Sequence, residues 1–143
     1  MKLGENIIQT QFNTYLNIYI MNPVELYKGE TPAPVYSELG DNLIKVYFNR
    51  ESAKVTVPLM DDSGDTKTVT EHTAWHVDVE PEYRKIISGI VRSKYSQDDV
   101  EAIICNHTEG RGDADEYNAF VAWREEARKV ATNVMEELAK VVK

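Results

Sequence analysis

The stretch from Pro81 to Val142 carries the most regular hydrophobic pattern in the chain, and it constrains the fold more than any other feature. It opens on Glu80-Pro81-Glu82, a favourable helix start, because proline suits the first helical position and acidic residues suit the helix dipole. Apolar side chains then recur at i, i+3, i+4, i+7 and i+8, as Tyr83, Ile86, Ile87, Ile90 and Val91. This spacing places them on one face and predicts an amphipathic helix.

Capping residues predict two more helices after the first. Ser96 is followed three residues later by Asp99, which matches the capping box that starts a helix. The stretch from Asn106 to Gly112 interrupts the hydrophobic pattern with two glycines. Asp113 is a favourable N-cap for a last helix, which we expect to run from about Ala114 to the end of the chain.

The apolar residues of the last helix follow alternating steps of three and four, with one charged exception at Arg124. Such a series is typical of a coiled-coil-like seam. Two interpretations stay open: the helix packs on its own domain, or part of it forms a subunit interface in a homo-oligomer. On the second interpretation the interface residues are Tyr117, Phe120, Trp123, Val134, Leu138 and Val141.

Four segments of this helical block carry a resemblance: 90–96 with an I-x-R-x-x-Y-S junction, the acidic helix start at 98–103, 116–120 and 123–128. Together they resemble small proteins encoded by phages and prophages of gut Bacteroidetes. Those proteins combine a β-rich N-terminal part with a similar helix junction and final helix. The match covers roughly residues 81–131, about a third of the chain, and departs from the family pattern in the length of the break at 109–113. The resemblance implies a virion structural or assembly protein and supplies no catalytic residues.

The first half of the chain is predicted to form strands. The segments 43–48 and 53–59 are rich in β-branched and aromatic residues, and the polar Asn49-Arg50-Glu51-Ser52 between them predicts a hairpin over 43–59. A second turn is predicted at Asp61–Asp65, before a long alternating strand over 66–79 whose Trp75 side is expected to be buried. We therefore expect one α+β domain over residues 1–143, β-rich to residue 80 and helical from 81.

Two stretches before residue 43 are less regular. Residues 6–21 fit a strand, favoured by their aromatic and β-branched content, or a helix lined by Phe12 and Leu16. Residues 23–42 contain Pro23, Pro32 and Pro34, which cannot donate to a strand ladder. We expect a long surface connection there, with a proline-containing arm that reaches a partner as the alternative.

Net charge limits the kinds of partner. The chain has a formal charge of −8, and the segment from Asp61 to Glu116 alone holds 14 acidic and 6 basic residues. Such a segment repels phosphate, so we expect no nucleic-acid partner and instead protein partners. From the polar start of the chain we expect no signal peptide, and no apolar run in the sequence is long enough to cross a bilayer. We expect synthesis in the cytoplasm and no membrane contact.

Candidate reactive residues are few. The lone Cys105 is expected to be a small buried hydrophobe. His72 and His76 share a strand face about 13 Å apart, too far to hold one metal ion, and are expected to be solvated. His107 has no visible partner, and the glycine of the Asp61–Asp65 turn does not fit a calcium loop. We therefore expect that the chain is not an enzyme and that it binds no metal or cofactor.

Two functional interpretations follow. The first is a non-enzymatic phage or prophage virion structural or assembly accessory protein that acts through protein–protein contacts, with other virion proteins among its partners. The alternative is a small acidic regulatory or inhibitory module that masks a basic surface of a host protein.

Overall fold

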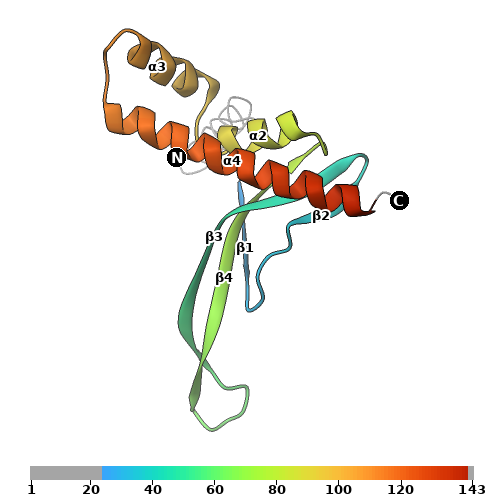
Figure 1. Cartoon of the computed structure of the whole chain (residues 1–143). Coiled ribbons are helices and arrows are strands. Elements are labelled where there is room, and N and C mark those ends of the chain that lie inside the picture. Colours follow the sequence, from blue (N-terminus) through green and yellow to red (C-terminus); the bar gives the residue numbers. More distant parts are fainter. Residues whose placement is uncertain (1–23, 142–143) are drawn as a thin grey trace, which may run out of the picture.

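A computed structural model describes residues 24–141, so the predicted segment 6–21 lies outside the described residues. Within that range the chain forms four strands followed by three helices, which confirms the α+β class (Figure 1). The strands pair antiparallel throughout in the order β1-β4-β3-β2. The elements are β1 (Glu25–Gly29), β2 (Tyr36–Gly40), β3 (Leu43–Pro58), β4 (Thr66–Val79), α2 (Tyr83–Arg92), α3 (Gln97–Thr108) and α4 (Ala114–Val141).

The hairpin predicted within 43–59 is corrected by the structure. No turn forms at 49–52; β3 continues through this segment and pairs along its whole length with β4, whose predicted bounds are confirmed. The polar residues form a bulge, in which Asn49 and Arg50 stand opposite the single Ala74. Asn49 takes a left-handed backbone with φ of 51°, which asparagine tolerates better than most residues. The hairpin turn lies at 59–65, where the second turn was predicted.

The surface connection expected over 23–42 is also corrected, because it contains the edge strands β1 and β2. Pro32 and Pro34 lie between the two strands, so no ladder hydrogen bond is lost to them. A tight turn then joins β2 to β3 through Gly40, Asp41 and Asn42, all with positive φ. The two short strands widen only the part of the sheet that lies nearest the helices. Beyond it, among the described residues, β3 and β4 pair only with each other and form a two-stranded ribbon.

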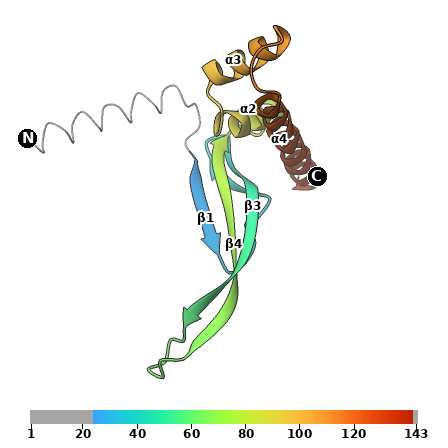
Figure 2. The ribbon, with the colours of Figure 1, turned by 90° about the vertical axis from the view of Figure 1, so that its left-hand side faces the viewer.

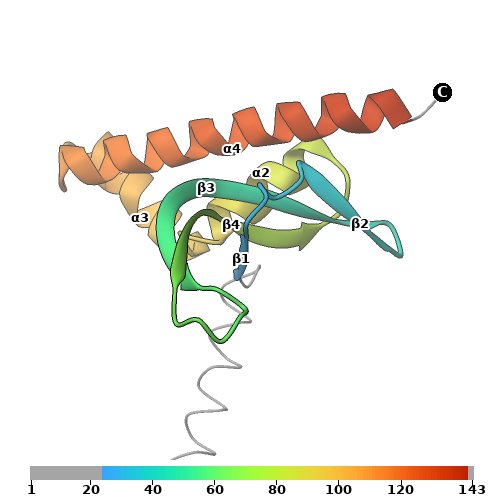
Figure 3. The same cartoon turned by 90° about the horizontal axis from the view of Figure 1, so that it is seen from below.

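One face of the upper sheet is covered by α2 and α4, and the main core lies between these layers (Figure 3). Trp75 is half-buried on this face, packed between the rings of Phe48 and Trp123, with centroids 6.1 and 5.9 Å away. The fully buried side chains include residues from both layers: Val46, Val77, Ile86, Ile90 and Val134. Burial of these apolar surfaces is the main stabilising contribution to the fold.

The opposite face of the sheet carries a smaller buried cluster of Ala33, Tyr47 and Ala74, with Tyr27 packed against it. The Arg50 guanidinium in the bulge donates to the carbonyl oxygens of Ala33 (2.5 Å) and Pro34 (2.6 Å). These charge-assisted hydrogen bonds hold the loop between β1 and β2 over this face.

The predicted caps of the last two helices are confirmed. Ser96 Oγ accepts from the Asp99 N–H at 3.1 Å, and the Asp99 carboxylate accepts from the Ser96 N–H at 3.2 Å. The Asp113 carboxylate accepts from the Asp115 N–H at 2.9 Å at the start of α4. The expected burial of Cys105 is wrong: α3 stands beyond the sheet and buries only Ile103, which leaves Cys105 exposed.

Candidate interaction surfaces

The predicted interface residues of α4 mostly face the chain's own core. Phe120 and Val134 are 4% and 0% exposed, and both belong to the main core. The half-buried members pack against that core: Tyr117, Trp123 and Leu138. Val141, at the end of α4, is 67% exposed. Five of the six side chains therefore pack within the domain of one copy of the chain, and their assignment to a subunit interface stays a prediction.

The most prominent free feature is a two-stranded arm, residues 51–72, formed by β3 beyond its bulge, the turn and the first part of β4. It extends far past β1, β2 and the helices (Figures 1 and 2). The strand segment 51–58 alone spans about 26 Å at the usual rise per residue. No residue between Asn49 and Thr73, all within the described part of the chain, is buried. The arm is thus not packed on the body.

Both long edges of the arm are unpaired within the described chain. On one side, β1 pairs with β4 only from His72 to His76. On the other side, β2 pairs with β3 only from Leu43 to Val46. Free edges offer backbone N–H and C=O groups to any strand that lies alongside, and natural proteins restrain such edges with charges and prolines. The charged and proline residues of this kind in the arm are Lys54, Pro58 and Lys67.

The two faces of the arm differ in chemistry. One face presents the half-buried Val55, Val57 and Val69, with Val55 directly opposite Val69. The other face carries polar side chains in cross-strand pairs, of which the central one joins Thr56 to Thr68. A small apolar strip on an otherwise exposed ribbon suits contact with another protein surface.

The turn at the end of the arm, residues 59–65, is here called the tip. The Leu59 N–H donates to the Asp65 carbonyl at 2.9 Å, and Gly64 supplies the positive φ of 75° that the turn needs. The Asp61 carboxylate accepts hydrogen bonds from the Ser63 hydroxyl and backbone N–H, which lower the pKa of Asp61. Met60 is fully exposed. The tip therefore presents one fully exposed apolar side chain beside three aspartates.

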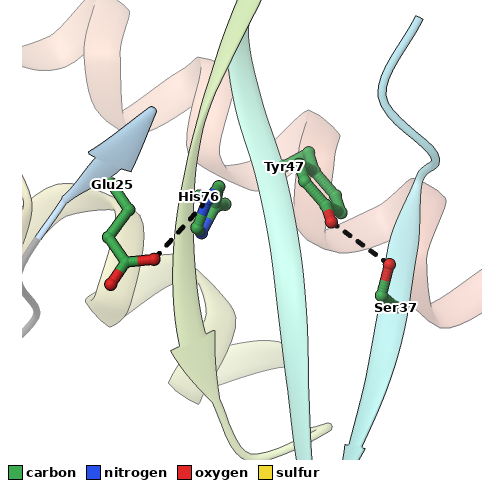
Figure 4. A network of polar contacts seen from close by, with 4 residues as sticks. All are labelled: Glu25, Ser37, Tyr47 and His76. Atoms are coloured by element: carbon green, nitrogen blue, oxygen red, sulfur yellow. Dashed lines mark hydrogen bonds and ion pairs between the residues drawn. The ribbon is translucent and has the colours of Figure 1, made fainter. Parts of the chain in front are cut away.

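His76 corrects the expectation that both strand histidines are solvated. His72 is half-exposed, but His76 is 8% exposed on the second face of the sheet. Its ring lies 5.4 Å from that of Tyr47, whose hydroxyl is hydrogen-bonded to Ser37 at 3.2 Å (Figure 4). Its Nε2 lies 3.7 Å from a carboxylate oxygen of Glu25 on β1. The sequence did not predict this burial because residues 23–42, which contain β1 and β2, were expected to form a surface connection.

The pKa of His76 is lowered, first by burial and then by the charge of Lys45, against opposing contributions from Glu25 and Asp78. The unfolded chain therefore takes up a proton more readily than the native chain. We expect the free energy of unfolding to fall as pH drops below about 6.5, by at most about 1.4 kcal/mol per pH unit from this site.

Urea unfolding of His76→Gln should show a weaker dependence on pH between 7.5 and 5.5 than the unsubstituted chain. His72→Gln, on the same strand, is the matched control and should keep the full dependence. Equal pH dependence in the two variants would contradict the assignment to His76.

The remaining candidate residues have structural surroundings. His107 stacks on Tyr117, with ring centroids 3.5 Å apart and planes 1° apart. Among residues 24–141 there is no group of three or more histidine, cysteine or acidic side chains placed to hold a metal ion. No helix in the same range has both the length and the apolar character needed to cross a membrane.

Comparison of the chain with known protein families, with characterised proteins and with solved structures finds no match.

Proposed function

We propose that this protein is a non-enzymatic structural or assembly subunit that acts through protein–protein contacts made by its arm. The virion-building role that the sequence resemblance implies is the setting in which such a subunit works. The observation that carries the proposal is the arm itself: a long ribbon with two unpaired edges and no buried residue between Asn49 and Thr73.

The energetics of the arm support this role. An isolated two-stranded ribbon is marginally stable in water, because it buries little apolar surface. A partner that adds a strand to either edge, or covers the strip of Val55, Val57 and Val69, supplies the missing hydrogen bonds and burial. The arm thus has the properties of a contact element that is completed on assembly.

The placement of the acidic residues favours an assembly subunit over an acidic module that masks a basic surface. The acidic segment does not form one patch: Asp61, Asp62 and Asp65 lie at the tip, whereas Asp98 and Asp99 lie at the start of α3. These sites are at opposite ends of the molecule (Figure 1). A single basic surface therefore cannot be covered by all of this charge at once.

A shortened arm tests the proposal. Ser52 and His72 are directly opposite each other in the hairpin, so replacing residues 53–71 by Asn-Gly closes a two-residue turn. The full-length chain should co-sediment with virions or assembly intermediates, and the shortened chain should not. The shortened chain should keep the helical signal of its circular dichroism and its unfolding midpoint, because no helical residue and no buried residue is removed.

Two outcomes would overturn the proposal. One is the absence of the full-length chain from both virions and assembly intermediates. The other is co-sedimentation of the shortened chain at the level of the full-length chain.

A further inference from the structure

The solvent-facing side of the helices holds a groove of about 610 Å³ between α2, α3 and α4. Its floor is apolar and includes Val91 and Phe120, which are 8% and 4% exposed. Its sides carry exposed apolar groups as well, among them Tyr83 and Ile104. An apolar hollow with exposed apolar walls favours a ligand that brings an apolar side chain.

The charge of the groove is opposite to that of the chain as a whole. Arg84 and Arg92 line it from α2, and Arg124 and Arg128 line it from α4. The described residues that line it include no acidic side chain. Arg128 contacts Glu125 at 3.4 Å, but both groups are about half-exposed, so this pair contributes little. Through Arg84, Arg124 and Arg128 the groove therefore attracts an acidic ligand, in a chain whose net charge is −8.

The tip of the arm has the complementary chemistry. Met60 is a fully exposed, flexible apolar side chain, and Asp61, Asp62 and Asp65 surround it with negative charge. A methionine can adapt to an irregular apolar hollow. Carboxylates are the natural partners of arginine, which binds them through two parallel hydrogen bonds.

The tip cannot reach the groove of its own chain. The arm leads away from the helices, and the tip lies at the opposite end of the molecule from α2, α3 and α4 (Figures 1 and 2). A contact between the two surfaces must therefore join two copies of the chain.

We propose that the tip of one copy docks in the arginine groove of a second copy. Met60 enters the apolar floor near Phe120, and the tip aspartates face the groove arginines. This inference rests on the proposed function of the arm and names its partner. Because the two surfaces differ, the contact is head-to-tail, and repetition gives a closed ring or an open chain of subunits.

Reciprocal charge reversal tests the contact in solution. The tip variant carries Asp62→Arg and Asp65→Arg, and leaves Asp61 in place because its carboxylate bonds to Ser63 within the turn. The groove variant carries Arg124→Glu and Arg128→Glu. Molar mass is measured by light scattering across a concentration series for the full-length chain, each variant and their equimolar mixture.

The full-length chain should self-associate. Each variant alone should associate about 100-fold more weakly, because each reversed charge turns an attraction into a repulsion. The equimolar mixture should recover association to within about 10-fold of the unsubstituted chain, since the reversed tip meets the reversed groove and the native tip meets the native groove. Only a direct contact between these two surfaces predicts such recovery.

Two controls separate this contact from a general effect of charge or folding. Lys129→Glu with Lys140→Glu makes the same change of charge on α4 outside the groove and should leave association within about 3-fold. Met60→Ala changes no charge, and it should weaken association by about 10-fold or more through lost apolar burial.

A monomeric full-length chain at every concentration would overturn the inference, as would a groove variant that associates like the unsubstituted chain. Either result leaves co-sedimentation of the arm as the separate test of the proposed function. If the shortened arm abolishes co-sedimentation while groove reversal changes nothing, the arm binds a different protein and the groove is not its partner.

Discussion

Phe120→Ala is expected to lower the free energy of unfolding by about 3–5 kcal/mol. The Phe120 side chain is 4% exposed, and its ring meets that of Tyr95 edge-on at a centroid distance of 5.2 Å. It lies in the same buried cluster as Ile103 of α3, so it joins α4 to α3. Alanine would leave a cavity at the place where three helices meet, and the surrounding side chains would lose their contacts.

Chemical denaturation measures this effect, with Val121→Ala as the matched control on the next residue. Val121 is 45% exposed, so its truncation should change the free energy of unfolding by less than about 0.5 kcal/mol. A Phe120→Ala variant as stable as the unsubstituted chain would contradict the packing described for α4. It would return Phe120 to the subunit interface that the coiled-coil-like spacing also allowed.

Trp123→Ala is the second substitution expected to have a large effect, about 3 kcal/mol or more of unfolding free energy. The Trp123 ring packs against Phe48 at 6.0 Å and Trp75 at 5.9 Å, both on the sheet. Its indole N–H donates to the Ile90 carbonyl on α2 at 3.1 Å, and Lys94 Nζ lies 4.6 Å from the ring centroid. One side chain thus links α4 to α2 and to the sheet.

Trp123→Phe separates these contributions. Phenylalanine keeps an aromatic ring near Trp75 but lacks the N–H donor. The Ile90 carbonyl still accepts from Ser93, so this variant should lose only about 1 kcal/mol. Equal losses for Trp123→Phe and Trp123→Ala, measured by denaturant unfolding, would show that the ring contacts contribute little and would contradict the described packing.

Local signals predicted the parts of the fold that depend on neighbours in sequence. The strand over 66–79 alternates along its length, and the reciprocal bonds of Ser96 and Asp99 need only three residues of spacing. The segment 49–52 shows the limit of such signals. Its polar residues suit a turn or a bulge equally, and only pairing with β4 across Ala74 decides between them.

Features that depend on tertiary contacts were not predicted. Because His76 and Cys105 both depend on what covers them, the sequence placed both wrongly. The arginine groove is formed where α2, α3 and α4 lie together, and no spacing within any one of these helices indicates it. The sequence predicted the strands and the turn of the arm. That the edges of the arm are unpaired depends on where β1 and β2 end, which the sequence did not indicate.

Hydrogen exchange of the arm tests the central claim most directly, that the arm is a contact surface completed on assembly. The amides of 51–58 and 66–71 that point away from the hairpin are unpaired in the described chain and should exchange quickly when the protein is free. In sedimented assemblies these same amides should become protected, while those of 75 and 76, which β1 and β3 pair on both sides, should keep their rate. Equal exchange of the arm amides in the free and assembled protein would contradict the account.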